Sequence, residues 1–596
     1  MNSPSPISRR GFNRGLVGAA LAARCGAAGA EPAERKIRIA VRDSARKWLR
    51  SESVAMTDMP PSFSLHAARN ETEAFQIGLQ ATRDTLENVR VTLEPALGPD
   101  GRQIKPEDID LFRVQWFSID APSDTFGRAG FWPDPLVRFN GALQVAAAAP
   151  TVLWVRVNIR ADTTPGNYRG RIVVEAAGET QTIEWSVRVY GVVLPAEMTL
   201  PFLVGLDWES IRRLETGATP ERFSREIAPR YLASLREAGA VPFNPFESLP
   251  ALPDDPAASI DFEGIDRRLQ ETAALLASEA PVPVPFALNA PVDTKRFPLF
   301  SPAWRSRTLA YLKAVARHYE ARGLMERSFI YVAEADEPTR SAQVERIVEL
   351  HRLAAEADPR FRVVQTIHAR CFDCKEPMLR TLESPNTQWV PNIAFYDGRA
   401  LAGARTALGK VELVEVPSEW KDTMDRQVRR SGRQVWLYFN ASTTVLPQAD
   451  QPQYPSLNID HDAMAHRVIG WIAWNEQIAA VGHWMATYWR GPTGPWEGVP
   501  RGEGGRGTNG DGVLLYPGRG APGAPSAAKG PMPSIRLEMM RESGEDHKLL
   551  TLAERRLGRE ATRALSKNVH NGLHKFPLDP APMREARIAL LTELSR

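Results

Sequence analysis

The stretch SFIYVAEADEPTR, residues 328–340, joins an apolar run to a cluster of acidic side chains. The run from 329 to 333 has the length and composition of a buried strand, and Pro338 suits the first turn of a following helix. Between the two lie three acids within four residues: Glu334, Asp336 and Glu337. One acid would be enough to cap the helix, so the cluster indicates a catalytic site at the end of a strand.

Residues 200–560 repeat this pattern of an apolar strand followed by an amphipathic helix. The eight strand-like segments are 200–208, 240–246, 281–290, 328–337, 361–369, 387–397, 433–440 and 480–489. Such alternation requires parallel pairing with crossover helices. Eight units in about 360 residues predict a (β/α)8 barrel of the TIM type, with its site at the C-terminal ends of the strands. A doubly wound open sheet is the alternative, but no Gly-rich dinucleotide loop supports it.

Residues 36–195 have a different rhythm. Short segments such as NVRVTLEP and TVLWVRVNIRA alternate apolar with polar residues, and turn sequences such as TPGN at 164–167 separate them. Short alternating strands at this spacing predict an antiparallel β-sandwich. We therefore expect a multidomain α+β protein, with a sandwich at 36–195, a catalytic barrel at 200–560 and a C-terminal helical extension at 561–596.

The first 30 residues predict an export signal. SRRGF at 8–12 resembles a twin-arginine motif, a short apolar run follows, and AGA at 28–30 fits a cleavage site. A disordered, Ala-rich leader is the alternative. Removing residues 1–30 takes away four arginines and no acids, which lowers the net charge from +3 to −1. We expect a periplasmic or secreted protein with no nucleic-acid partner and no stable membrane insertion.

Acids, amides and large aromatic side chains gather at the predicted strand ends. This combination suits a sugar, because its hydroxyls bind carboxylates and amides while its C–H face packs on aromatic rings. For Trp484 and Trp489, packing in the core is an equally good interpretation. The candidate substrate-binding residues are Asn289, His368, Tyr396, Tyr438, Asn440, Trp484, Tyr488, Trp489 and Asp511.

The acid pair Asp336 and Glu337 restricts the mechanism, since neighbouring residues on one strand cannot easily flank a sugar ring from both faces. They can serve a substrate that carries its own nucleophile. In a 2-acetamido sugar the acetamido oxygen attacks C1 and forms an oxazolinium ion. We assign Asp336 to holding the acetamido N–H and Glu337 to general acid and base catalysis, which needs a raised pKa at Glu337.

These residues resemble glycoside hydrolase family 123, the retaining β-N-acetylgalactosaminidases. The similarity rests on the order and spacing of DEP at 336–338, WLYFN at 436–440, GDGVLLYPG at 510–518 and SIRLE at 534–538. It covers most of residues 36–560. The resemblance implies a sandwich before a barrel and a substrate-assisted Asp–Glu pair. Arg536, Glu538 and Arg541 open the last predicted helix, either as surface charges or as a support for the barrel mouth.

Two other functions stay open. One is a glycosidase acting on a sugar without an acetamido group, with Asp207, Asp397 or Asp511 as its nucleophile; the other is a non-catalytic glycan-binding protein. Cys371 and Cys374 form a C-x-x-C motif that we interpret as a disulfide or two thiols rather than half of a metal site with His368, because no second such motif exists. We therefore expect no metal and no cofactor. Glu334 has no assigned role.

Overall fold

The computed structural model describes most of the chain from residue 35 to 596. The residues outside the description are 1–34, 56–59, 140, 216–218, 255–258, 273–278, 333–340, 368–381, 403–411, 416–418, 433, 440–452, 492–493, 503–507 and 523–529. The predicted export signal therefore lies outside the described residues, and residues 36–596 form one compact unit.

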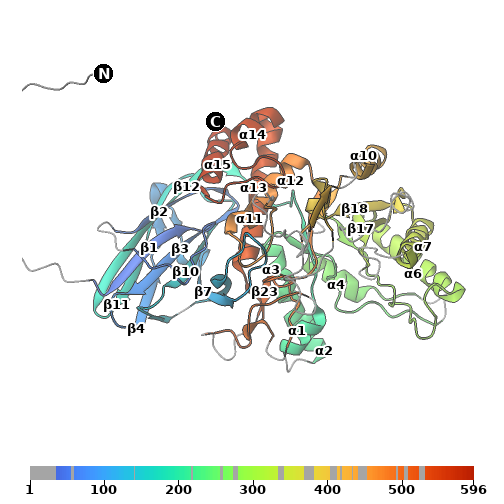
Figure 1. Cartoon of the computed structure of the whole chain (residues 1–596), viewed down its shortest axis with the longest axis horizontal. Helices are drawn as coiled ribbons and strands as arrows, with labels where there is room; N and C mark the ends of the chain where they lie inside the picture. Colours follow the sequence, from blue (N-terminus) through green and yellow to red (C-terminus); the bar gives the residue numbers. More distant parts are fainter. Residues whose placement is uncertain are drawn as a thin grey trace, which may run out of the picture. The chain divides into compact units, whose positions relative to one another are not determined.

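Two sheets make up the N-terminal region (Figure 1). The first has the order β1 (Ile37–Asp43), β3 (Glu71–Ala81), β10 (Thr151–Ile159), β7 (Ile109–Ile119) and β8 (Gly130–Arg138), and all its neighbours are antiparallel. The second has the order β2 (Ser62–Arg69), β12 (Glu179–Val193), β11 (Gly166–Ala176), β4 (Leu86–Leu93) and β9 (Ala142–Val145), with β5 (Ala96–Leu97) and β6 (Gln103–Ile104) beside it. Within the second sheet, β2 and β12 run parallel.

One apolar cluster joins the two N-terminal sheets. It contains Phe75 and Ile77 of β3 together with Ile172 of β11 and Trp185 of β12. The rings of Phe75 and Trp185 lie 6.3 Å apart across it. The predicted alternation is confirmed along β11, where buried residues occur at every second position. The N-terminal region is therefore mainly antiparallel β structure around a core of its own.

Eight short parallel strands follow in two four-stranded sheets. One has the order β14 (Ala240–Pro242), β13 (Phe202–Val204), β22 (Ala480–His483) and β21 (Trp436–Tyr438). The other has the order β15 (Val282–Pro283), β16 (Ser328–Ile330), β17 (Arg362–Ile367) and β18 (Thr387–Pro391). Each of the eight predicted ranges contains one of these strands, although every strand is shorter than predicted.

The two parallel sheets meet on one side and share their inner apolar face. Asn392, just after β18, forms a parallel bridge with Tyr438 of β21. Leu203 of β13, Phe329 of β16, Val390 of β18 and Trp436 of β21 belong to one buried cluster. Among the described residues β14 and β15 are not paired, so a closed barrel is not observed and remains a prediction.

Helices separate these strands along the chain. They are α1 (Trp208–Leu214), α2 (Pro220–Arg222) continuing through a π-helical turn (Phe223–Ile227) into α3 (Ala228–Glu237), α4 (Glu263–Glu271), α6 (Pro302–Glu320), α7 (Ser341–Ala357), α9 (Ile393–Tyr396), α10 (Glu419–Ser431), α11 (Ala463–Arg467) and α12 (Ile469–Glu476). In α6, Ser301 caps the first turn by accepting a hydrogen bond from the Trp304 amide at 3.2 Å, and Pro302 follows it. Two antiparallel strand pairs, β19 (Arg399–Ala402) with β20 (Glu412–Glu415) and β23 (Leu515–Tyr516) with β24 (Met532–Pro533), complete this region.

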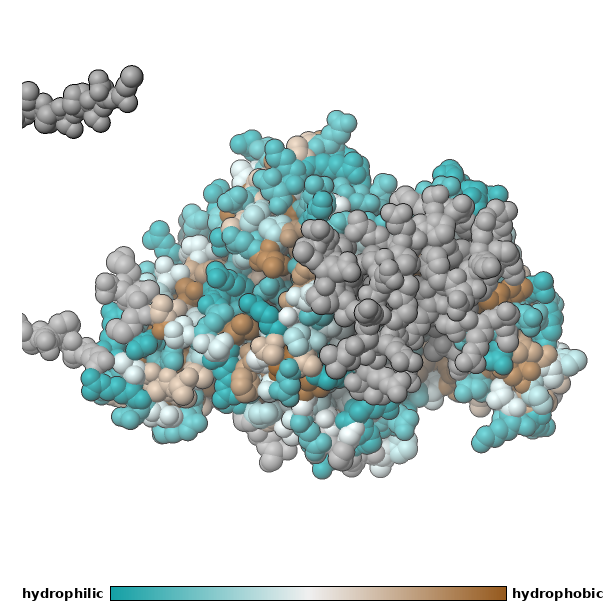
Figure 2. Space-filling view, viewed as in Figure 1, coloured by the Kyte–Doolittle hydropathy of each residue, from teal (hydrophilic) through white to brown (hydrophobic). Residues whose placement is uncertain are grey.

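The long helix α13 (Ile535–Leu557) links the two regions (Figure 1). Its Ser543 hydroxyl accepts a hydrogen bond from the amide of Gly470 in α12, and its Glu538 pairs with Arg156 of β10 at 3.0 Å. Helices α14 (Arg559–Ser566) and α15 (Ala581–Leu594) follow. The face drawn in Figure 2 carries mostly hydrophilic side chains, with hydrophobic ones in small scattered groups. None of the described helices is both long and apolar enough to span a bilayer.

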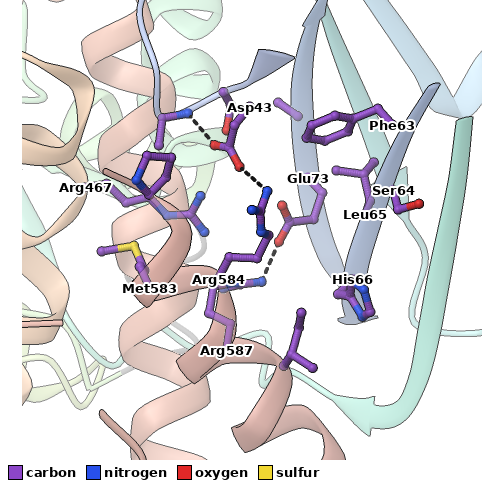
Figure 3. A pocket seen from close by; sticks show the side chains of 15 residues that line it. Asp43, Phe63, Ser64, Leu65, His66, Glu73, Arg467, Met583, Arg584 and Arg587 are labelled. Atoms are coloured by element: carbon purple, nitrogen blue, oxygen red, sulfur yellow. Dashed lines mark hydrogen bonds and ion pairs between the residues drawn. The ribbon is translucent and has the colours of Figure 1, made fainter. Parts of the chain in front are cut away.

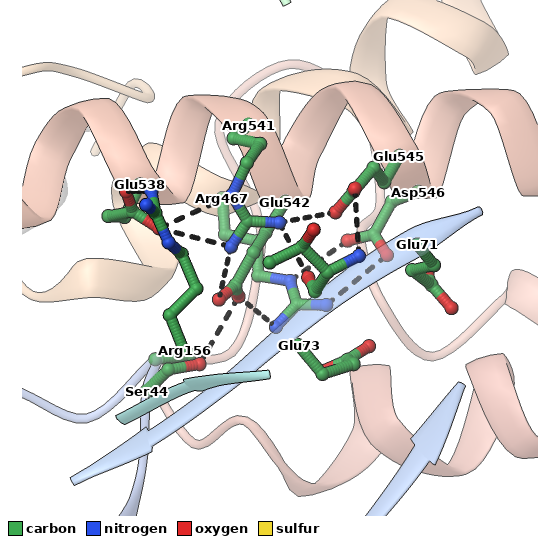
Figure 4. Close-up of polar contacts among 12 residues, drawn as sticks. Ser44, Glu71, Glu73, Arg156, Arg467, Glu538, Arg541, Glu542, Glu545 and Asp546 are labelled. Atoms are coloured by element: carbon green, nitrogen blue, oxygen red, sulfur yellow. Dashed lines mark hydrogen bonds and ion pairs between the residues drawn. The ribbon is translucent and has the colours of Figure 1, made fainter. Parts of the chain in front are cut away.

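A largely buried group of charges lies between the first sheet and helices α11, α13 and α15 (Figure 4). We call it the junction cluster; its members are Arg156, Arg467, Arg541, Arg587, Glu71, Glu73, Glu538, Glu542, Glu545 and Asp546. Glu73 and Arg587 also line a small cavity of about 40 Å³, which Asp43, His66 and Arg584 border (Figure 3). This volume is enough for ordered water and too small for a sugar.

Candidate active site

The parallel strands direct their C-terminal ends toward one edge, which is where barrel enzymes hold their catalytic groups. Val332 is the last described residue after β16, so the predicted pair Asp336 and Glu337 follows this strand but lies outside the described residues. The same is true of other residues singled out from the sequence: Glu334, His368, Cys371, Cys374 and Asn440.

Aromatic side chains meet where β14 and β16 end. The ring of Tyr331, which follows β16, lies 4.7 Å from the ring of Phe243, which follows β14. Both rings pack against the inner apolar cluster of the parallel strands. The ends of β14 and β16 are therefore close together.

A second group, formed by Trp484, Tyr488 and Asp511, follows β22. The Trp484 and Tyr488 rings are tilted against each other with their centroids 4.8 Å apart. The indole N–H of Trp484 donates to Oδ1 of Asp511 at 2.7 Å. The Tyr488 amide donates to the carbonyl of Gly512 at 2.9 Å, which holds the two segments together. Three of the predicted substrate-binding residues thus form one contact group.

Two glycines make room for this group. Gly512 has a φ of +76°, and a Cβ there would lie 2.6 Å from the Trp484 ring. A Cβ on Gly502 would lie 2.3 Å from Oδ2 of Asp511. Neither contact is possible for a real side chain, so both positions require glycine for the carboxyl and the indole to sit as they do.

Burial raises the pKa of Asp511 to about 6, although the hydrogen bond from Trp484 and the positive charge of Arg536 oppose the shift. The carboxyl group therefore changes its charge within the range in which many enzymes work. The side chain that donates to it, Trp484, is neutral. Such a carboxyl can accept hydrogen bonds from sugar hydroxyls when charged and donate one when protonated.

The other predicted binding residues have different positions. Trp489 is fully buried, donates its indole N–H to the Leu515 carbonyl at 2.9 Å and packs on Tyr231. Its position gives it a packing role rather than a substrate contact, because the indole has its partner in the core. Tyr438 is buried in the inner cluster, while Asn289 is exposed in the turn after β15. Tyr396 is half-buried in α9, and burial raises the pKa of its phenol to about 12.

Two of the three alternative nucleophiles have structural contacts. Asp207 caps α1, accepting hydrogen bonds from the Ser210 amide at 3.1 Å and the Ser210 hydroxyl at 2.6 Å. Asp397 accepts a hydrogen bond from the Tyr454 hydroxyl at 2.7 Å, and its Oδ2 lies 3.0 Å from Nδ1 of His574. Asp207 therefore serves as a helix cap, and Asp397 is the partner of Tyr454 and His574, so both acids have a structural role without a substrate.

The sequence did not single out Asn244, which follows β14. Its side chain accepts a hydrogen bond from the Leu206 amide at 2.8 Å and donates to the Leu206 carbonyl at 2.7 Å. It therefore clamps the end of β13 to the end of β14. Its place after a strand was the only available signal. Among the residues that the structure describes, no group of three or more metal-ligating side chains occurs.

Comparison with known proteins identifies the class. Residues 289–553 match the model of the glycoside hydrolase 123 catalytic domain. This match covers less than half of the chain and indicates a glycosidase, whose substrate is a carbohydrate. A family 123 glycoside hydrolase from Clostridium perfringens, described for glycolipid glycan hydrolysis, is similar over 94% of this chain and 97% of its own, with 14% identity and a TM-score of 0.60. This likeness shows a shared fold.

A β-D-glucuronidase from Dictyoglomus thermophilum is a more distant match, covering 80% of this chain and 67% of its own at 8% identity and a TM-score of 0.30. A likeness of this degree carries no argument about this protein. None of the curated proteins compared matches the chain.

Proposed function

We propose that this glycosidase is a retaining β-N-acetylgalactosaminidase that uses the 2-acetamido group of its substrate as the nucleophile. The observation that carries the proposal is the position of Asp336 and Glu337 in the sequence, as two adjacent acids that come after β16 within the region that matches the family 123 catalytic domain. Adjacent acids cannot easily act from opposite faces of a sugar ring, but they can assist a nucleophile that the substrate supplies.

The reaction has two steps. First, the acetamido oxygen attacks C1 as the bond from C1 to the leaving oxygen breaks, and Glu337 gives its proton to that oxygen. Asp336 accepts a hydrogen bond from the acetamido N–H and stabilises the positive charge of the oxazolinium ion. Water then attacks C1, Glu337 takes its proton, and the acetamido group is regenerated with the original configuration at C1.

Trp484, Tyr488 and Asp511 support a sugar-binding role for the group after β22. An indole and a phenol beside a carboxyl offer both the apolar and the polar contacts that a hexose needs. The order of the eight parallel strands also fits the circular order of a (β/α)8 barrel, opened between β14 and β15. We therefore include in the proposal a barrel preceded by a sandwich, and export through the leader at 1–30.

Hydrolysis of paired aryl glycosides tests the reaction. The wild-type protein is expected to cleave the 4-nitrophenyl β-glycoside of N-acetylgalactosamine and not the matching β-galactoside. A thiazoline mimic of the oxazolinium ion should inhibit strongly, because it resembles the intermediate. Cleavage of both glycosides at similar rates, without thiazoline inhibition, would instead support a carboxylate nucleophile. The raised pKa of Asp511 makes it a poor choice for that role.

Three amide variants separate the acids. Glu337→Gln should lower kcat about 10²–10⁴-fold, and more on a glycan than on the nitrophenyl glycoside, whose leaving group needs little protonation. Asp336→Asn should be impaired equally on both. Glu334→Gln is the matched control from the same segment and should keep its rate. Unchanged turnover in Glu337→Gln would contradict the proposal. Glycan binding without any hydrolysis by the wild type would indicate a glycan-binding protein.

A further inference from the structure

An ion pair between Asp134 and Arg536 crosses from the N-terminal sheet to the catalytic region. Asp134 lies in β8 and Arg536 in the first turn of α13, and both side chains are fully buried. The pair is bidentate, with Nε donating to Oδ1 at 2.9 Å and a terminal nitrogen donating to Oδ2 at 2.8 Å. The Tyr516 hydroxyl also donates to Oδ2.

The rest of the Arg536 guanidinium binds the backbone on both sides of Asp511. It donates to the carbonyls of Leu457 and Gly510, each at 2.8 Å, and to the carbonyl of Val513. A guanidinium has five N–H groups, and these five contacts give each of them an acceptor. Because every donor is used, the 510–513 segment can hardly shift without leaving a buried donor unpaired.

A second contact from the N-terminal region reaches the same segment. Asn509 donates its amide to the Ser123 hydroxyl and its side-chain N–H to the Ala121 carbonyl, both at 2.9 Å. Ser123 is in turn bound to Asp460 through its amide and its hydroxyl. The residues before and after Asp511 are thus both tied to the loop and strand that lead from β7 into β8.

We propose that the N-terminal sheet completes the sugar-binding site, with Asp134 and Arg536 as positioning residues that hold the 509–513 segment so that Asp511 and Trp484 meet the sugar. The inference rests on the proposed function, which assigns Asp511 and Trp484 to sugar binding. The N-terminal region then has a direct effect on substrate affinity, besides its contribution to stability.

The Arg536→Lys variant separates the positioning of the 509–513 segment from the positive charge at this site. Arg536→Lys keeps the pair with Asp134, but three N–H groups cannot reach all of the carbonyls. We expect a folded protein with KM raised about ten-fold and a smaller change in kcat, since misplacement of binding groups costs affinity. Asp134→Asn should shift KM in the same direction, and Asp134→Glu should restore part of the loss.

Glu538→Gln is the matched control. Glu538 also pairs across the same boundary, with Arg156 of β10, and is also buried, but it makes no contact with the 509–513 segment. Its KM should stay within about two-fold of the wild type. If Glu538→Gln raises KM as much as Arg536→Lys does, the contacts between the N-terminal sheet and α13 affect KM only through the stability of the fold, and the inference fails. An unchanged KM in folded Arg536→Lys also overturns it.

A fluorescence measurement tests the positioning role of Arg536 independently of the proposed function. The fluorescence of Trp484, obtained as the difference between each protein and its Trp484→Phe variant, should follow the ionisation of Asp511, because the two side chains are hydrogen-bonded. Arg536→Lys should alter this titration, and Glu538→Gln should not. If the wild type cleaves no acetamido glycoside but the titration still responds to Arg536→Lys alone, the proposed function fails and the positioning stands. An identical titration in both variants overturns the positioning.

Discussion

Buried carboxyl groups occur in two very different settings in this protein. In the junction cluster, six carboxylates share four arginines. Asp511 instead accepts a hydrogen bond from the neutral indole of Trp484, and the N–H groups of the nearby Arg536 donate to Asp134 and to backbone carbonyls. Burial raises the pKa of Asp511 and also that of Glu73. A carboxyl enclosed by guanidinium groups stabilises the fold, whereas Asp511 is held by two neutral donors, the Trp484 indole and the Gly512 amide, and is the carboxyl that we propose binds the sugar.

The acids inside the junction cluster differ from one another. Burial raises the pKa of Glu542 and Glu545, and the neighbouring arginines only partly offset this effect. For Asp546, burial also acts upward, but Arg467 and Arg587 outweigh it and the pKa falls. Burial therefore favours the protonated form of Glu542 and Glu545, while the arginines favour the charged form of Asp546. The cluster is therefore a pH-dependent structural contact between the first sheet and the C-terminal helices.

Removing Arg587 should have the largest effect on stability. Arg587 pairs with Glu71, Glu73 and Asp546, and it is buried. Arg587→Met leaves these acids without their cation and should cost about 3–5 kcal/mol in the free energy of unfolding, measured by urea denaturation. The KM of the remaining folded enzyme should not change. Arg584→Met is the control, because Arg584 is exposed and pairs only with Asp43, so it should cost less than about 1 kcal/mol.

Asp511→Asn should do the reverse and affect kinetics rather than stability. Losing a charged hydrogen-bond acceptor for the sugar costs about 1.5–3 kcal/mol, which is roughly a 10–100-fold loss in kcat/KM. The difference in kcat/KM between the wild type and Asp511→Asn should be largest above pH 6, where the wild-type carboxyl is charged, and should become smaller below pH 6. A loss of stability as large as that of Arg587→Met would show that the two settings do not differ as described.

Glu73 tests the pH dependence of the junction cluster. Burial raises its pKa from the usual 4.5 to about 8, against the opposing charge of Arg587. The folded protein thus holds this proton more tightly than the unfolded chain, so the stabilisation is complete below pH 4.5 and is lost as the pH rises through about 8. Glu73→Gln should flatten the fall in Tm between pH 5 and pH 8 by the equivalent of at least about 1.4 kcal/mol. A steeper fall would contradict the assignment.

The smallest effect is expected at Asp207, a strand-end acid that serves as a helix cap. Asp207→Ala removes the acceptor for the Ser210 amide and should cost about 1 kcal/mol of stability. Asp207→Asn should keep most of it, because an amide oxygen can accept the same hydrogen bond. Loss of all activity in a folded Asp207→Asn variant, measured on the acetamido glycoside, would return Asp207 to the catalytic candidates.

Much of the architecture could be predicted, because strands and helices leave periodic patterns in the chain. Each of the eight parallel strands lies within its predicted range, and the alternation in 36–195 predicted antiparallel strands. The grouping of Trp484, Tyr488 and Asp511 was partly predictable, since two of them follow β22 and the third lies in the GDGVLLYPG motif at 510–518. The buried position of Trp489 could not be predicted, because a tryptophan near a strand end gives the same sequence pattern whether it faces a ligand or the core.

The sequence by itself determined the class of elements and pointed to an acid pair after one strand, since both depend on neighbouring residues. The tertiary structure alone decided which charged groups meet. Asp134 and Arg536 are separated by 402 positions, and Arg587 reaches Glu71 across 516. No local pattern encodes such pairs, because they form only when the first sheet packs against α13 and α15 and the buried charges must find partners. For the same reason, the connection from the N-terminal sheet to Asp511 becomes visible only in the folded chain.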